Sequence, residues 1–366
     1  MSLEEPIPAP PEKRPRRAIN LVVMAILALL LTVMTLVNIG AGDSMVSERV
    51  QPGVVLQVIR LHLPFIASRT PPLSEDAVEH NADTIVWDTR TPGVLAGVLV
   101  GALLAIAGVA FQSFLQNPLA DPYMVGVSSG AALGSVVVIL MGGTGLLFGW
   151  AQPLAAFATG LLATAIVYFL AQKQGRLSSQ TFLLAGIVVG TFFWSFVPLA
   201  ISLGNRSGNM DRQSAILSRL LGSLHDIQWS HVVLLAVFGA MGGLMLWTGA
   251  YELDMMALGE ESAAHLGVNV EGFKRRIILA GALVTAAAVS VAGIIAFVGL
   301  VVPHIARRIV GPSHRILLPA SFLLGGLVLT TADWLSRVYL AQLEVGVITS
   351  LLGAPVFCYL LRRRLG

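Results

Sequence analysis

Charged side chains are scarce in this sequence. Asp, Glu, Lys and Arg make up 12% of its 366 residues, about half the share found in an ordinary soluble domain. Hydrophobic residues make up 55%, and the mean hydropathy is +0.80. Apolar runs long enough to cross the hydrocarbon of a bilayer recur along the chain. The sequence therefore predicts an all-α polytopic membrane protein.

Two further absences restrict the chemistry. The single cysteine, Cys358, lies in the last apolar run, so neither a disulfide framework nor a cysteine metal cluster is available. The chain also lacks the Gly-x-x-x-x-Gly-Lys-Ser/Thr loop that binds nucleotide phosphates. We therefore expect no metal site, no cofactor bound by this chain and no enzymatic activity of its own.

Ionisable residues are almost missing from the interiors of the apolar runs. A transporter driven by an ion gradient usually keeps such groups at mid-membrane. If this chain moves a solute uphill, the energy must therefore come from another polypeptide. A secondary transporter working alone and a non-transporting membrane scaffold are the alternatives from other classes.

The apolar runs predict about ten membrane-spanning helices. One stretch, 277–310, would be about 51 Å long as a single helix, too long for one upright span. Gly293, Gly299 and Pro303 can break it into a hairpin, and basic residues flank both of its ends. The ten predicted spans are Ala18–Ile39, Gly93–Phe114, Tyr123–Leu147, Pro153–Ala171, Phe182–Leu203, His231–Gly249, Ile277–Ala292, Gly293–Val310, Ile316–Trp334 and Gly346–Leu361.

The distribution of basic residues predicts the orientation. With both termini in the cytoplasm, most of the 23 Lys and Arg residues fall on the cytoplasmic side, as the positive-inside rule requires. The basic pI of about 9.3 then reflects orientation, and we expect no nucleic-acid partner. The predicted organisation is a cytoplasmic tail, 1–17, and a transmembrane domain, 18–366, with an extended outer loop, 40–92, and a cytoplasmic region, 250–276. No role can be assigned to the loop stretch Leu63–Asp83.

The polar interval contains a short helix signal, Ala257–Gly267. Glu260 and Glu261 stand at its start and Gly267 at its end, which suits the two ends of a helix. Its apolar positions, Leu258, Ala263 and Leu266, could pack against a partner other than lipid. A solvated loop between two membrane helices is the alternative interpretation.

A second signal lies in the stretch 112–122, where two prolines bracket a short cytoplasmic turn. Irregular backbone at membrane depth is tolerated where it borders a cavity. Gln112, Gln116 and Asn117 would offer uncharged polar groups there, and the two glutamines are candidates for the solute pathway. An ordinary turn between helices is the alternative. Glycines repeated at four-residue spacing, such as Gly97 and Gly101, predict close helix contacts.

Several motifs occur together in one order along the chain. They are Leu115–Pro122 with Gly126–Gly130, Leu183–Gly186, Ala257–Glu260 with His265–Gly267, Phe297–His304, His314–Arg315 with Leu318–Pro319, Ala332–Asp333 and Gly353–Phe357. With these motifs, from about Trp87 to the C-terminus, the chain resembles the FecCD-type permease subunits of ABC transporters, which import iron-siderophores, haem and vitamin B12.

The resemblance implies a type II ABC importer permease fold in the bacterial inner membrane. It implies a second permease subunit, as a homodimer or a heterodimer, and two ATPase subunits that bind ATP and Mg²⁺. It also implies a periplasmic or lipid-anchored binding protein. The expected cargo is a bulky metal chelate, with a ferric siderophore as the first candidate and haem or cobalamin as alternatives.

The resemblance also implies three groups of site residues. The ATPase-coupling group is Leu258, Gly259, Glu260, Ser262, Ala263, Leu266 and Gly267. The cytoplasmic gate group is Asn117, Leu119, Ser179 and Gln180. Arg90 and Arg337 match positions that dock the binding protein, although Gly93 stands where a second arginine often follows the first.

Overall fold

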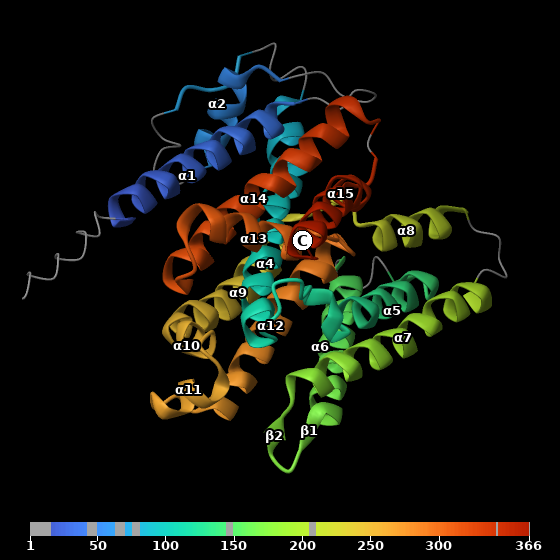
Figure 1. Ribbon diagram of the computed structural model, residues 1–366. Coiled ribbons are helices and arrows are strands. Elements are labelled where there is room, and N and C mark those ends of the chain that lie inside the picture. Colours follow the sequence, from blue (N-terminus) through green and yellow to red (C-terminus); the bar gives the residue numbers. More distant parts are fainter. Residues whose placement is uncertain are drawn as a thin grey trace, which may run out of the picture.

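The structure, a computed structural model, describes residues 16–41, 50–62, 70–74, 81–143, 149–204, 210–341 and 343–365. Within these ranges the chain consists of helices, short links and a single two-stranded hairpin (Figure 1). The predicted all-α architecture is confirmed. Residues 1–15 of the expected tail and most of 63–83 lie outside the described residues.

Ten helices in the described part of the chain overlap the ten predicted spans, one helix to each span. Seven of them are long and apolar enough to cross a bilayer, whereas α5, α13 and α15 have shorter apolar stretches. The ten are α1 (Arg16–Gly40), α4 (Thr91–Phe114), α5 (Val127–Leu140), α6 (Ala151–Ala171), α7 (Ser179–Gly204), α9 (Trp229–Thr248), α12 (Val270–Ala292), α13 (Val298–Val310), α14 (His314–Tyr339) and α15 (Val345–Leu365).

The remaining elements lie mainly at the two ends of the bundle. They are α2 (Pro52–His62), the π-helix η2 (Thr84–Arg90), the 3₁₀-helix η3 (Pro122–Val125), β1 (Gln172–Lys173), β2 (Arg176–Leu177), α8 (Met210–Leu221), α10 (Ala250–Met256) and α11 (Glu260–His265). Figure 1 shows α10, α11 and the β1–β2 hairpin together at the bottom of the view, with α2 at the top. We call these the α11 end and the α2 end. The amphipathic helix α8 was not predicted.

Helix α4 forms the centre of the bundle. It packs against α14, α12, α13 and α9, and 21 of its 24 residues are buried. Small residues permit this enclosure: a Cβ atom on Gly101 would collide with the Gly325 backbone, and one on Gly108 with the Gly299 backbone. In lipid, such close backbone approach supplies the packing that holds helices together, as the glycine spacing predicted.

The predicted break between α12 and α13 is present. Helix α12 ends at Ala292, and the link to Val298 contains two left-handed residues, Gly293 at φ 72° and Phe297 at φ 68°. Gly299 then packs beside the carbonyl of Leu104, in the middle of α4. Helix α13 therefore starts halfway along the bundle, which explains its length of 13 residues.

One helix start was wrong. The sequence predicted a helix that opens at Tyr123, but η3 occupies 122–125, Gly126 is left-handed at φ 81°, and α5 begins at Val127. Pro122 packs against Gly299, and the Tyr123 hydroxyl donates to the Ile295 carbonyl at 2.9 Å. The chain after α4 therefore folds back into the bundle instead of forming a surface turn.

Candidate functional site

The predicted coupling segment forms a short exposed helix. Helix α11 is bounded by two left-handed glycines, Gly259 at φ 104° and Gly267 at φ 88°, and is shorter than the predicted range. Leu258 and Leu266 are 64% and 60% exposed, while Ala263 is fully buried. The segment is thus seated through Ala263 and presents two leucines outward. The other coupling residues, Glu260 and Ser262, lie on the same exposed turn.

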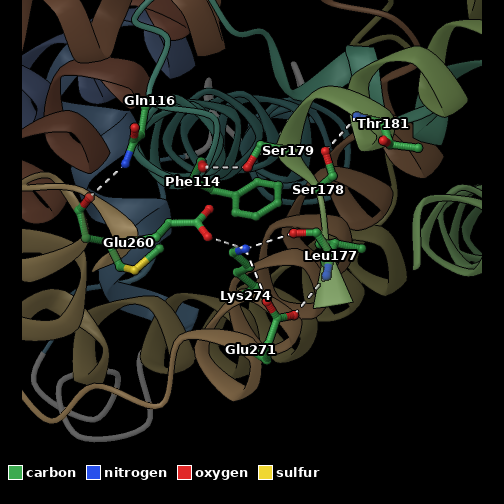
Figure 2. A network of polar contacts seen from close by, with 10 residues as sticks. Phe114, Gln116, Leu177, Ser178, Ser179, Thr181, Glu260, Glu271 and Lys274 are labelled. Carbon is green, nitrogen blue, oxygen red and sulfur yellow. Dashed lines mark hydrogen bonds and ion pairs between the residues drawn. The ribbon is translucent and has the colours of Figure 1, made fainter. Parts of the chain in front are cut away.

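A buried lysine ties this helix to the rest of the α11 end (Figure 2). The Lys274 ammonium donates to Glu260 of α11 at 2.7 Å, to the carbonyl of Leu177 in β2 at 2.8 Å and to Glu271 of α12 at 3.3 Å. Glu271 also accepts the Leu177 backbone N–H at 3.0 Å. Three elements therefore meet at one cation.

The same network reaches the predicted gate residues. Leu177 is followed by Ser178 and then Ser179, the first residue of α7, whose hydroxyl lies 3.5 Å from the Phe114 carbonyl at the end of α4. The rings of Phe114 and Phe182 pack edge to face with centroids 5.4 Å apart. The structure thus brings the start of α7, with Ser179 and Gln180, against the end of α4.

The other two predicted gate residues follow α4 directly. The Asn117 side chain accepts the Leu119 backbone N–H at 3.0 Å, which shapes this turn. Beside them, the exposed Gln116 donates to the Met256 carbonyl at the end of α10, at 3.1 Å. The gate role of all four residues stays a prediction, but their proximity to the coupling segment is a feature of the fold.

A second polar tie holds α10. Asp254 lies 2.6 Å from the Nδ1 of His314, and Nε2 of the same ring lies 2.6 Å from the Ser113 hydroxyl. The contacts run Asp–His–Ser, as in the catalytic triad of a hydrolase. Ser113, however, is only 8% exposed where α4 meets α14, so a substrate has little access to its hydroxyl. This chain of contacts therefore fixes the segment before α11 to α14 and α4.

The candidate pathway residue Gln112 is enclosed. It is 3% exposed, and its amide donates to the carbonyls of Leu300 at 3.1 Å and Gly299 at 3.5 Å. Its described contacts therefore join α4 to α13. A direct role of Gln112 in the pathway stays a prediction, as does that of Gln116.

The two arginines expected to dock a binding protein are buried at the α2 end. Arg90 is 4% exposed and donates to the Ile39 carbonyl at 3.3 Å. Arg337 is 8% exposed and pairs with Asp333 at 3.1 Å, and Asn38 of α1 donates to the same carboxylate at 2.8 Å. Arg90 thus joins η2 to α1, and Arg337 forms an ion pair within α14. The docking role of both arginines stays a prediction.

The glycine at position 93 has a steric explanation. A Cβ atom there would lie 3.1 Å from the guanidinium of Arg337 and 3.4 Å from the Leu224 carbonyl. A long basic side chain at this position would displace Arg337 from the pair with Asp333. The departure from the double-arginine pattern therefore accompanies the burial of Arg337.

Sequence reasoning missed Lys274, Glu271, Leu177 and Asp254. The basic run that starts at Lys274 served only to predict the hairpin at 277–310 and the orientation of the chain. The three-residue spacing of Glu271 and Lys274 on a helix could have indicated one ion pair. Leu177, 97 positions from Lys274, gives no local signal, because only the tertiary fold brings its carbonyl to the ammonium.

The chain is similar in sequence to a family of known proteins. The FecCD transport family matches residues 23–363. The chain belongs to this family. Among curated relatives, this FecCD protein is 43% identical over 284 residues to the uncharacterized ABC transporter permease protein YvrB of Bacillus subtilis (strain 168), covering 76% of this chain and 79% of YvrB.

Named relatives come from two kinds of import system. The cobalamin import system permease protein BtuC of Halobacterium salinarum is 42% identical, with 78% of this chain and 76% of BtuC covered. The hemin transport system permease protein HmuU of Yersinia pestis is 37% identical, with 80% of this chain and 86% of HmuU covered. The FecCD protein is therefore a multi-pass permease of the ABC importer type.

Solved structures agree on the fold. An ABC transporter assigned to the metal-chelate type, in an inward-facing conformation, matches 93% of this chain and 99% of its own, with a TM-score of 0.76 at 25% identity. PsaBC of Streptococcus pneumoniae, solved with a Fab, matches 77% of this chain and 94% of its own, with a TM-score of 0.52 at 18% identity. The predicted importer-permease fold is confirmed.

Proposed function

We propose that this FecCD protein is the permease subunit of an ABC importer that carries a bulky metal chelate, with a ferric siderophore as the first candidate. A separate ATPase, which binds ATP and Mg²⁺, supplies the energy at the α11 end. A binding protein delivers the cargo at the α2 end, and two permease copies enclose the path. The observation that carries this proposal is α11 itself, a short helix anchored through Ala263 and Lys274 with Leu258 and Leu266 exposed.

The orientation follows from charge. Exposed basic side chains gather on segments of the α11 end, namely Lys173, Arg176, Arg275, Arg308 and Arg315. Because the cytoplasmic loops of bacterial inner-membrane proteins carry an excess of Lys and Arg, we place this end and both termini in the cytoplasm.

The mechanism is alternating access driven from the cytoplasmic side. ATP binding closes the paired ATPases and displaces α11, and the contact between the end of α4 and the start of α7 changes with it. Charged side chains that are buried in the described helices, such as Lys274 and Arg337, lie within the first or last two turns. The spans can therefore pass a large ligand without holding it by charge, and selectivity rests largely with the binding protein.

The cargo is argued from its chemical class. The relatives BtuC and HmuU are named for cobalamin and hemin, both bulky organic molecules that hold a metal ion. Ferric siderophores belong to the same chemical class. Haem and cobalamin are therefore the two alternative cargoes that the test must include.

Reconstitution tests the proposal. The permease is placed in liposomes with the ATPase and the binding protein that the proposal requires, and uptake of a ferric siderophore, hemin and cobalamin is measured. We expect ATP-dependent uptake of one of the three, lost when residues 260–267 are deleted. Uptake by the permease alone, driven by an ion gradient, would overturn the proposal.

One partly buried carboxyl gives the secondary-transporter alternative a specific test. Asp121 accepts the Tyr123 backbone N–H at 2.9 Å, next to Pro122 in the middle of the bundle, so it could serve as a proton carrier. Under our proposal, Asp121→Asn keeps uptake dependent on ATP and indifferent to the proton gradient. Under the alternative, uptake collapses with the gradient and with this substitution.

A further inference from the structure

Lys274 makes every hydrogen bond that its ammonium can donate. A lysine ammonium has three N–H donors, and they go to Glu260, Glu271 and the Leu177 carbonyl. These acceptors belong to α11, to the first turn of α12 and to the strand that leads into α7. One side chain therefore occupies the junction between the coupling helix and the predicted gate (Figure 2).

The two acids around Lys274 differ in what holds them. Glu271 lies on the same helix as Lys274 and also accepts the Leu177 N–H, so both polar groups of the Leu177 backbone are bound. Glu260 is carried by α11, and its side chain is 44% exposed, while the Lys274 side chain is 3% exposed. Glu271 and Leu177 are thus the two partners of Lys274 that stay in place, and Glu260 is the partner that can move away with α11.

This asymmetry keeps the buried charge paired when the partner leaves. Breaking a buried ion pair is costly when it strands a charge, but Lys274 retains Glu271 if Glu260 withdraws. Gly259 precedes Glu260 with a left-handed backbone, and a Cβ atom there would meet nothing within 4 Å. The contacts of Lys274 with Glu271 and Leu177 do not involve α11, so they can persist when Glu260 moves with that helix.

We propose that Lys274 is the positioning residue that transmits a displacement of α11 to the start of α7. Movement of α11 acts through Glu260 on the ammonium, through the ammonium on Leu177, and through Ser178 on Ser179. The Asp254–His314 contact holds α10 to α14 meanwhile, so the displacement is directed to α7. This inference rests on the proposed function and names the side chain through which that function is coupled.

The test measures ligand imported per ATP hydrolysed in the reconstituted complex. Lys274→Met keeps the length of the side chain and removes its donors. We expect ATP hydrolysis within about twofold of the parent and import per ATP lower by about tenfold, which is within the range expected for a single substitution in a coupling network. Lys274→Arg, which keeps the charge, restores part of the ratio. The control is Lys173→Met, at an exposed lysine of the β1–β2 hairpin that also contains Leu177. This variant leaves the ratio unchanged.

The outcomes separate this inference from the proposed function. If the parent complex imports no ligand with ATP, the proposed function fails. If the parent imports and Lys274→Met imports equally well per ATP, the inference fails alone. Should Lys274→Met not assemble, Lys274→Arg and Glu260→Gln decide, because both keep a partner for each buried charge. A normal ratio in both overturns the inference, and a lowered ratio with the ATPase still bound supports it.

Discussion

A buried cation sits at each end of the bundle, and the two are paired in different ways. At the α2 end, the side chains of Arg337 and Asp333 lie on one helix and are 10% and 4% exposed. At the α11 end, the Lys274 side chain is 3% exposed, but its partners Glu260 and Glu271 are 44% and 30% exposed. The first pair is enclosed, and the second opens to solvent through its acids.

The difference separates two uses of a buried charge. The enclosed Asp333 carboxylate accepts from Arg337 of its own helix and from Asn38 of α1, so it holds α14 and α1 in one arrangement. Lys274 has two partly exposed carboxylates beside it, so it can lose the contact with Glu260 and still be neutralised by Glu271. We therefore expect damage at the α2 end to appear as lost stability and damage at the α11 end as lost coupling.

The largest effect is expected at the enclosed pair. Asp333→Leu leaves Arg337 buried without its carboxylate, which costs about 3–5 kcal/mol and lowers the melting temperature of the purified permease in detergent. The double variant Asp333→Leu/Arg337→Met removes both charges and should recover much of the loss. A single variant as stable as the parent would remove the basis of the comparison.

The next largest loss of stability is expected at the close contact between α4 and α14, which lies between the two ends. Gly325→Ala places a Cβ atom against the Gly101 carbonyl, and overpacking of this kind costs about 1–3 kcal/mol. Gly53→Ala in α2 is the control, because its Cβ would meet nothing within 4 Å. Thermal unfolding of both variants gives the comparison, and equal melting temperatures would contradict the close contact.

A smaller stability effect is expected at Lys274 and its two partly exposed carboxylates. Glu260→Gln removes the charge of a partly solvated carboxylate, while Lys274 keeps its contacts with Glu271 and Leu177. The free energy of unfolding should therefore fall by about 1 kcal/mol or less. Import per ATP should fall in the same variant. A melting temperature as low as that of Asp333→Leu would show that the two ends are alike.

The smallest effect is a pH dependence at the α2 end. His225 lies 3.6 Å from Glu344, and this carboxylate raises the pKa of His225 above its usual value despite partial burial. Burial alone would raise the pKa of Glu344, but contacts with His225, Ser218 and Ser223 leave it lowered.

The sign of this effect follows from the two shifts. The contribution of His225 is complete below pH 6.5 and is lost as the pH rises through its raised folded pKa, and that of Glu344 is lost on acidification. His225→Gln should therefore lower the melting temperature most near pH 5.5 and hardly at pH 8.5. A difference independent of pH would exclude the ion pair as its cause.

The sequence predicted the fold well where hydropathy and charge act together. The break at Gly293 followed from basic residues at both ends of a run too long for one helix, and left-handed Gly293 and Phe297 confirm it. The start at Tyr123 was wrong, because the fold-back depends on Pro122 meeting Gly299, a contact between distant segments. Helix α8 was missed because its surface is amphipathic and its length is short.

The site was predicted only in outline. The ends of α11 follow from local helix chemistry at Glu260 and Gly267, and the structure shows them within a few residues. Burial of Arg90 and Arg337 was not predicted, although the four-residue spacing of Asp333 and Arg337 could have indicated an ion pair on one helix. The junction at Lys274 depends on Leu177 and Glu260, which only the tertiary fold brings together.

The enclosure of α4 has a consequence for biogenesis. Its sequence, Thr91–Phe114, contains no charged residue, so it can enter the bilayer on its own soon after synthesis. The helices that cover it, α12 and α14, are translated much later. Until the chain has passed Tyr339, the glycine surfaces of this helix face lipid, and the permease must be inserted almost to its last span before its centre can close.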